Sequence, residues 1–357
     1  MKRLLIFPLL LLLISVNPVQ RQNNLSVVLK TTPSATEIGP DSTFVKTTLT
    51  VVDAAGQAVP NAYLKLHLDA PSGNAFISTD FPIVEGTPLI EYEGILPDGL
   101  LEFSYIYPIR GAYNFEVEAG RDPATATYKD TLTLTISENR NEIFSFIIFA
   151  ALLLVLGLVA GFIIGRGARA QQMATGGLAL LIGAGLVISS TAVAQAHGGG
   201  DVSDAEPFTE SATNGDLTVA YAMNPGAGRV GTFNALTFSA TDTQGNPTSD
   251  TTFDVTLWHI EDEKPVFAAT LYAPEGNANL NFQFFDGAEH EVRLAASNSA
   301  GLVQLTRVVE VEGINPPLPT KIKTTIYLVL ITFVGILVGL RIQVVQGKKQ
   351  QFAPVGA

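Results

Sequence analysis

The chain contains no cysteine among its 357 residues. Thiolate catalysis, cysteine-ligated zinc, iron–sulfur clusters and a lipid anchor on a cysteine are therefore excluded. Domains of about 100 residues can still be stable without disulfides, because core burial alone is sufficient at that size. The sequence also lacks a Gly-rich phosphate loop, a G-x-S-x-G elbow and an H-E-x-x-H pair. We therefore predict that the protein is not an enzyme.

Acidic side chains are missing from long stretches of the chain. All thirty-three Asp and Glu residues fall in two windows, Glu37–Glu142 and Asp201–Glu312. Residues 25–142 carry sixteen acids against seven Lys and Arg, a net charge of −9, and residues 197–320 carry seventeen against four, a net of −13. Domains this negative repel phosphate backbones, so we expect no nucleic-acid partner.

Three apolar runs interrupt this acidic pattern. We predict transmembrane helices over residues 143–165, 175–195 and 324–343, since each is near the roughly 20 residues that cross a bilayer. A mean hydropathy of +0.30 with only 15% charged residues agrees with several membrane segments. The runs contain no charged or histidine side chain up to Leu340. This favours membrane anchors over a transporter or channel, which places polar groups at membrane depth.

Basic residues set the predicted orientation. The loop 166–174 carries Arg166 and Arg169, and the tail 344–357 carries two lysines. By the positive-inside rule both segments are cytoplasmic, so both acidic domains face outward from the cell (inner) membrane. Lys321 and Lys323 lie on the outer flank of the last helix. Their position counts against this orientation; the alternative is that they bind outer-leaflet phosphates, which makes membrane lipid an expected partner.

Two segments resemble signal peptides. Residues 1–22 begin with Lys2 and Arg3, followed by an apolar run of thirteen residues that is too short to span a bilayer. The run at 175–195 has a basic start and an apolar centre, and it is followed by small residues up to Ala196. It is either a retained membrane span or an internal signal peptide that is cleaved after Ala196, leaving His197 as a new N-terminus.

Small residues recur four apart in two of the apolar runs. The residues are Gly157, Gly161 and Gly165 in the first run, and Gly335 and Gly339 in the last. This spacing allows helix backbones to approach closely, so we consider that these runs pack against another helix, although glycine is also simply common in membrane helices.

Both acidic windows show the period-two pattern of strands. In the first, Leu64, Leu66 and Leu68 alternate with polar residues, and strands are separated by turns such as DAAGQAVP. The second window repeats this plan, with the turn DTQGNPTS at the matching place. We predict two immunoglobulin-like β-sandwiches, over residues 25–140 and 200–314, that arose by internal duplication with about one residue of slippage in the last hairpin.

The order of strand, D-x-x-G-x-P turn, strand and late G-x-Y-x-F-x-V strand resembles the bacterial YtkA-like and FixH-like extracytoplasmic domains. The pattern covers about residues 43–119 and 233–297. It is also similar to the periplasmic copper carriers of the CopC type, which place an Asp and a His around the turn glycine as D-G-H. Here the turns read Ala55-Gly56-Gln57 and Gln244-Gly245-Asn246. The expected copper ligands are absent from both turns.

Four histidines are available for metal chemistry. His67 alternates with apolar residues and should face solvent, whereas His259 and His290 share strand faces with apolar residues and should point inward as ordinary core histidines. The alternative is a Cu(II) site formed by His197, His259, His290 and Asp201, since copper(II) favours nitrogen and carboxylate ligands.

These patterns predict a membrane-anchored envelope protein with two extracytoplasmic immunoglobulin-like domains. We expect it to bind a protein partner or help assemble a complex, with exposed strand edges as the docking surface. No cofactor is expected under this interpretation. The alternative function is copper binding or delivery centred on His197.

Overall fold

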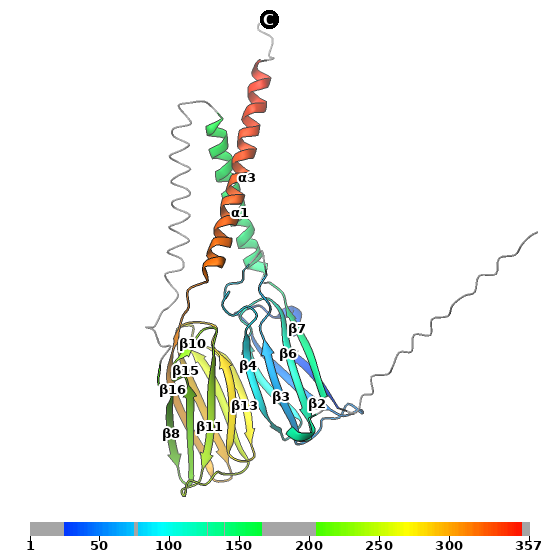
Figure 1. Cartoon of the computed structure of the whole chain (residues 1–357), viewed down its shortest axis with the longest axis vertical. Helices are drawn as coiled ribbons and strands as arrows, with labels where there is room; N and C mark the ends of the chain where they lie inside the picture. The colour runs from blue at the N-terminus through cyan, green and yellow to red at the C-terminus, as the bar shows by residue number, and fades with distance from the viewer. Residues whose placement is uncertain (1–24, 75–77, 127, 139, 166–204, 352–357) are drawn as a thin grey trace, which may run out of the picture.

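The computed structural model describes residues 25–74, 78–126, 128–138, 140–165 and 205–351. Within these ranges, sixteen strands form two eight-stranded sheets, and two long helices extend from one end of the sheets (Figure 1). The strands group into two sandwiches, one before the first helix and one after it. We call residues 25–165 the first half and residues 205–351 the second half.

The first half is a seven-stranded sandwich. Three strands, β1-β2-β5, face four others, β7-β6-β3-β4, and every pairing is antiparallel. The strands are β1 (Ser26–Thr32), β2 (Phe44–Val52), β3 (Ala62–Asp69), β4 (Pro88–Leu96), β5 (Leu100–Ile106), β6 (Gly111–Gly120) and β7 (Tyr128–Ile136). Two short 3-10 turns accompany them, η1 (Ala35–Glu37) and η2 (Pro123–Thr125). This three-on-four arrangement is immunoglobulin-like.

The second half repeats this sandwich and adds two strands at its outer edges. Its strands are β8 (Phe208–Asn214), β9 (Leu217–Asn224), β10 (Gly228–Arg229), β11 (Phe233–Thr241), β12 (Thr251–His259), β13 (Lys264–Ala273), β14 (Asn277–Gln283), β15 (Glu289–Asn298) and β16 (Gly301–Glu312). The added strands are β8, which pairs with β9, and β10, which pairs in parallel with β16. The prediction of two β-sandwiches is confirmed.

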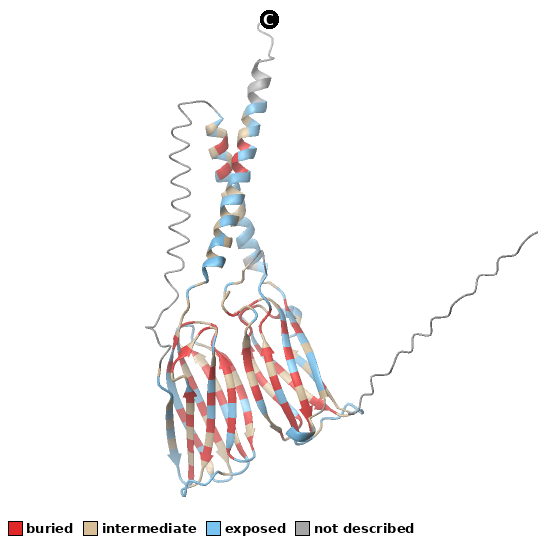
Figure 2. Cartoon of the chain, viewed as in Figure 1, coloured by how far each residue is buried: buried red, intermediate tan, exposed pale blue. Residues whose placement is uncertain are grey.

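Alternating side chains build the core, as the sequence pattern indicates. Leu64, Leu66 and Leu68 on β3 are at most 1% exposed, and Tyr113 and Phe115 on β6 are fully buried. Figure 2 shows this alternation of buried and exposed positions along the strands of both halves. Because successive strand residues point to opposite faces, each sheet presents one apolar face to the other sheet.

The two halves are joined by strand pairing that the sequence did not reveal. The edge strands of the first half, β4 and β5, pair antiparallel with β14 and β13 of the second half. Both sheets therefore run without interruption through the junction, as single sheets of eight strands. Two side-chain hydrogen bonds also cross it, from Asn281 Nδ2 to Glu91 Oε2 (2.8 Å) and from Gln283 Nε2 to Thr87 Oγ1 (2.9 Å).

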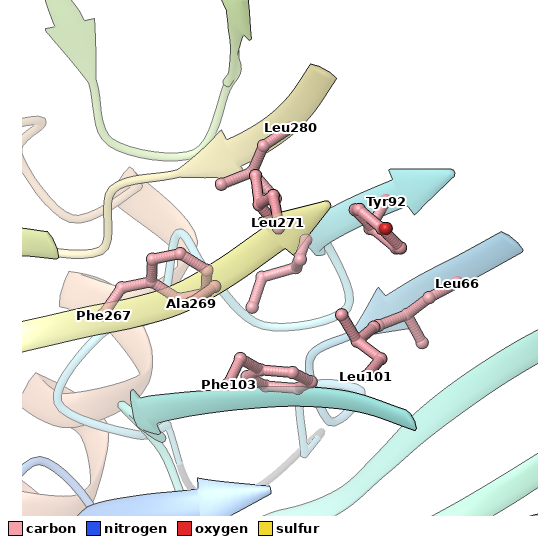
Figure 3. A pocket seen from close by; sticks show the side chains of 9 residues that line it. Leu66, Tyr92, Leu101, Phe103, Phe267, Ala269, Leu271 and Leu280 are labelled. Atoms are coloured by element: carbon pink, nitrogen blue, oxygen red, sulfur yellow. The ribbon is translucent and has the colours of Figure 1, made fainter. Parts of the chain in front are cut away.

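Apolar side chains from both halves fill the space between the sheets at this junction. They converge around a cavity of about 10 Å³, which is at the lower limit for holding one water (Figure 3). The cavity is lined by Leu66, Ile90, Tyr92, Leu101, Phe103, Phe267, Ala269, Leu271 and Leu280. One hydrophobic core thus extends through both halves.

The junction has local twofold symmetry. Ile90 lies opposite Phe282 in one sheet, and Phe267 lies opposite Tyr105 in the other. Counting from 90 to 267 and from 105 to 282 gives the same separation of 177 positions. The same chain segments therefore meet with their roles exchanged, as in a symmetric dimer interface.

The turn loops of the two halves share one geometry, as the predicted duplication requires. Asp53 Oδ1 accepts hydrogen bonds from the backbone N–H groups of Ala55 and Gln57, at 2.8 and 2.9 Å. Asp242 Oδ1 accepts the equivalent bonds in the second half, from Gln244 and Asn246, at the same distances. The pairing of β6 and β15 with their neighbours places His290 at the position of Tyr113, one residue away from the match suggested by Gly111 and Gly287. This is the predicted one-residue slippage.

Two helices follow the two sandwiches, α1 (Arg140–Ile164) and α3 (Leu318–Gln351). Both are long and apolar enough to cross a membrane, over Ile143–Ile164 and Leu318–Val345. α3 begins six residues before the predicted segment 324–343, with Pro319 in its first turn, where the missing N–H costs nothing. The predicted segments 1–22 and 175–195 lie outside the described residues.

The glycines mark the place where α1 and α3 cross. A Cβ on Gly335 would lie 3.0 Å from the Cα of Gly157, and a Cβ on Gly157 would lie 3.1 Å from the Cα of Gly335. Gly161 and Gly339 approach the backbone of Ile336 and Leu158 in the same reciprocal way. The interpretation of the glycine spacing as helix packing is confirmed. The numbers of the contacting residues increase together along both helices. α1 and α3 therefore run parallel, away from the sandwiches (Figure 1).

Leu280→Ala tests the shared core. Leu280 is 1% exposed in the junction, so its truncation should lower the free energy of unfolding by about 2–5 kcal/mol. The same substitution at Leu302, which is 50% exposed, should change it by at most about 0.5 kcal/mol. Denaturant unfolding in mild detergent measures both variants, and equal effects would contradict a packed junction.

Candidate functional site

Polar and ionisable groups gather at the end of the junction that is nearest the helices. His259 ends β12, and His290 lies directly opposite it near the start of β15. The acid that follows β14, Asp286, and the lysine that begins β13, Lys264, lie beside them. Asp41, from the loop before β2, completes the group from the first half. We call these residues, together with Asp262, the histidine cluster.

The two imidazole rings pack edge to face. Their centroids are 4.9 Å apart, and the ring of Phe284 lies 5.0 Å from that of His290. Both histidines are buried, 3% and 2% exposed, which confirms the expectation that they point into the sandwich. His290 Nδ1 lies 3.1 Å from the carbonyl oxygen of Ala288. This geometry assigns the proton of neutral His290 to Nδ1, because a carbonyl can only accept.

His259 has carboxylates on both sides of its ring. Its Nδ1 accepts a hydrogen bond from the backbone N–H of Asp262 at 3.1 Å, which leaves the proton of the neutral ring on Nε2. Nε2 lies 3.4 Å from Asp286 Oδ2. Nε2 makes no hydrogen bond with any of the described residues. We therefore treat the contact with Asp286 as charge attraction.

Lys264 connects the cluster to the first half. Its Nζ lies 2.9 Å from Asp262 Oδ2 and 3.9 Å from Asp41 Oδ1. It also donates to the backbone oxygen of Asp41 at 3.4 Å. A charged group of the second half is therefore shared between acids of both halves, at an intermediate level of exposure.

This environment raises the pKa of some side chains in the cluster and lowers the pKa of others. Burial lowers the pKa of His290 to about 4. Interaction with Asp286 raises the pKa of His259 above its usual value, against the effect of burial. Removal from water, reinforced by the neighbouring acids and opposed by Lys264, raises the pKa of Asp41 to about 6. At neutral pH His290 is therefore uncharged, and His259 is the histidine of the pair that takes up a proton first.

The first half has a different residue at each histidine position. Tyr113 stands where the second half has His290; its ring packs on Tyr107 at 4.8 Å, and its hydroxyl donates to the Ile109 backbone oxygen at 2.6 Å. This is the tyrosine corner of immunoglobulin-like folds. In the second half the ring of His290 packs on Phe284, and its Nδ1 donates to the backbone oxygen of Ala288, two residues upstream. The histidine cluster is thus a feature that the two halves do not share.

The structure tests part of the predicted copper site. It brings His259 and His290 together, whereas His197 and Asp201 lie outside the described residues. Within the described ranges, no group of three or more His, Asp or Glu side chains is arranged to hold a metal ion. His67, expected to be a plain surface residue, is only 31% exposed in its side chain and lies between Glu91 (2.8 Å) and Asp69 (3.0 Å).

Sequence reasoning missed Asp41, Asp286 and Lys264. Asp41 and Lys264 are 223 positions apart, and only the junction brings them together. A signal for Asp286 was present, since it directly precedes the turn that leads into the strand of His290. The sequence pattern alone did not indicate that the ends of β12 and β14 meet.

Comparison with known proteins adds no functional assignment. No protein-family model matches the chain, and no curated protein matches it. Among solved structures, the adhesin InvE of Yersinia pseudotuberculosis matches at 11% identity, over 81% of this chain and 61% of that one, with a TM-score of 0.21. The Escherichia coli adhesin FdeC matches at 14% identity, over 82% and 65%, with a TM-score of 0.22. The alpha-2-macroglobulin of Escherichia coli matches at 9% identity, over 81% and 16%, with a TM-score of 0.22.

This chain thus spans less than two thirds of each of these three chains. Similarity at these scores carries no argument about function. The immunoglobulin-like assignment rests on the strand order of each half.

His290→Phe tests the titration of the cluster. The folded-state pKa of His290 is depressed to about 4, so the wild type loses stability as the pH falls below the ordinary value of 6.5. Phenylalanine does not titrate, so the stability of the variant relative to wild type should rise by about 2 kcal/mol between pH 7 and pH 5. Chemical unfolding at both pH values measures this change. Tyr113→Phe, at the equivalent position, should show no such change, and a flat His290→Phe difference would contradict a buried neutral imidazole.

Proposed function

We propose that this chain is a membrane-anchored envelope protein that presents its fused sandwiches outside the cytoplasm to bind a protein partner. The observation that carries this proposal is the parallel arrangement of α1 and α3, which leave the same end of one rigid β-unit. Both helices are apolar and mostly exposed along their lengths, as expected of surfaces that face lipid. The unit would stand upright on the membrane, with its acidic sandwiches in water.

Charge supports the orientation. Arg341, Lys348 and Lys349 lie in the last turns of α3, at the end remote from the sandwiches, and Arg166 and Arg169 follow α1 in the sequence. The positive-inside rule places these ends in the cytoplasm, at the inner face of the cell membrane. Because both helices run in the same direction, we propose that the predicted segment 175–195 crosses the membrane between them, as a retained span or as a processed signal peptide.

The proposed docking surface is the outer edge of the first half that is formed by β1. In the second half, β8 lies along β9, and Phe208 on β8 packs on Tyr221 at 5.4 Å. The strand of the first half that corresponds to β9 is β1. It ends its sheet, with no further strand beside it among the described residues. β8 thus shows how an added strand fits this fold, and we propose that an extended segment of the partner adds to β1 in this way.

Copper binding or delivery is a second candidate. It is favoured by one observation: the buried His259 Nε2 has no hydrogen-bond partner among the described residues and lies near His290 and Asp286. Under this proposal His197 and Asp201 would complete the ligand set. Metal analysis of the protein after exposure to micromolar Cu(II) tests it. Unchanged copper content after His259→Ala would overturn the role of this residue.

Single introduced cysteines test the membrane orientation of the chain. The chain has no cysteine of its own, so no native thiol reacts with the labelling reagent. Thr131→Cys on β7 and Thr213→Cys on β8 place thiols on exposed positions of the two halves. A membrane-impermeant thiol reagent should label both in intact cells, provided it reaches the periplasm, and should label Gln350→Cys only after lysis. Labelling of Gln350→Cys before lysis, or of either sandwich only after it, would overturn the orientation.

Val28→Lys tests docking at the β1 edge. Val28 is exposed on β1, and a charge at this position disfavours the addition of another strand. Proteins cross-linked in the membrane and purified with the chain in mild detergent should be depleted several-fold in this variant. Thr209→Lys, an exposed position on β8, is the matched control and should leave them unchanged. Loss of partners in the control alone would move the docking surface to the second half.

A further inference from the structure

The contact between the halves has the construction of an interface between separate subunits. Each half contributes the same pair of strands, and β4 of one meets the β5-equivalent strand of the other. A surface that meets its own equivalent in this way is self-complementary, which is the property of a twofold dimer interface. Ordinary neighbouring domains in one chain have no such requirement.

The symmetry continues into the helices. Gly157 faces Gly335, and the separations from 157 to 335 and from 161 to 339 are both 178 positions, within one residue of the value at the sheets. The glycine contacts are reciprocal: Gly161 lies against Ile336, and Gly339 lies against Leu158. Sheet and helix contacts thus obey one pseudo-twofold relation, and each half is a complete sandwich followed by its own helix.

We propose that the chain is a covalently linked dimer of two single-anchor units. The β4/β5 edge and the face of α1 that carries Gly157 and Gly161, which we call the glycine face, together form a subunit-association surface. The partner of this surface is a second unit of the same construction. Assembly then depends on this surface and not on the covalent connection between Ile164 and Ala205. The proposal goes beyond partner binding and does not depend on which protein the β1 edge recognises.

The physical basis is the size and character of the contact. Strands pair in both sheets, nine buried side chains from both halves line the shared core, and four glycines bring the helix backbones together. Fully buried apolar contact of this kind is typical of permanent subunit interfaces, which resemble a domain core cut in half. Lys264 and Asp41 add a charge contact at the helix-proximal end.

A split chain tests the proposal with every residue present. Residues 1–172 and residues 166–357, the latter behind an added start methionine, are expressed together as two polypeptides with different tags. We expect them to co-purify in mild detergent in equal amounts and to elute at the position of the intact chain. Separate elution, or failure of both polypeptides to accumulate in the membrane, would overturn the proposal.

A cross-strand disulfide then checks that the split pair has the native register. Ser104 on β5 lies opposite Ala268 on β13, and paired residues of antiparallel strands have Cα separations that a disulfide can span. Ser104→Cys with Ala268→Cys should therefore link the two polypeptides on oxidation. Lys46→Cys with Ala268→Cys is the control, because β2 is separated from β13 by β5 and should give no link. Linkage in the control pair alone would contradict the register.

Substitutions in the glycine face distinguish an effect on the association of the two polypeptides from an effect on the folding of each half. Gly157→Ile with Gly161→Ile should release the two polypeptides of the split pair, because a larger side chain at either position overlaps the backbone of α3. In the intact chain the same change should leave the sandwiches joined, since the connection keeps their effective concentration high. Ala151→Ile, at an exposed position of α1, should not affect co-purification. Full co-purification of the glycine variant would show that the helices do not belong to the surface and would overturn that part of the proposal.

Discussion

Edge-to-edge strand pairing between the halves is the interaction on which the architecture depends. An unpaired edge strand exposes backbone N–H and C=O groups and is open to unwanted pairing. Here β4 and β5 are covered by β14 and β13, so each half covers one edge of both sheets of the other. Each helix follows the last strand of its sandwich, and α1 and α3 meet where their glycines approach each other. Within the histidine cluster, the contact of Lys264 with Asp41 crosses between the halves.

Because the contact between the halves is symmetric, the features that differ between the two halves are informative. The two halves agree in their turns, their core positions and their glycines. They differ at the ends of their strands, where the second half has the histidine cluster and the first has a tyrosine corner. They differ also in the strands added along β9 and β16. In a duplicated chain such differences locate the places where one half has acquired a separate role, and they are the places on which the proposed functions rest.

Much of each half could be predicted from its own sequence. The alternation of Leu64, Leu66 and Leu68 indicated the buried face of β3, and the inward orientation of His259 and His290 followed from the same period of two. The glycine spacing indicated the helix crossing, since glycine four apart leaves a groove that only another backbone fills. The junction could not be predicted, because β4 and β5 carry the same inward apolar residues that any sandwich requires. Residues such as Asp41 and Lys264, which meet only across the junction, were hidden for the same reason.

Hydrogen exchange of the backbone amides in the intact chain tests the central claim most directly. If the sheets are continuous, peptides from β4, β5, β13 and β14 should exchange as slowly as those from the interior strands β3 and β12, because protection follows paired and buried backbone. Exchange in these four strands as rapid as in the terminal strands β1 and β7 would show that the sandwiches are separate and would contradict the account.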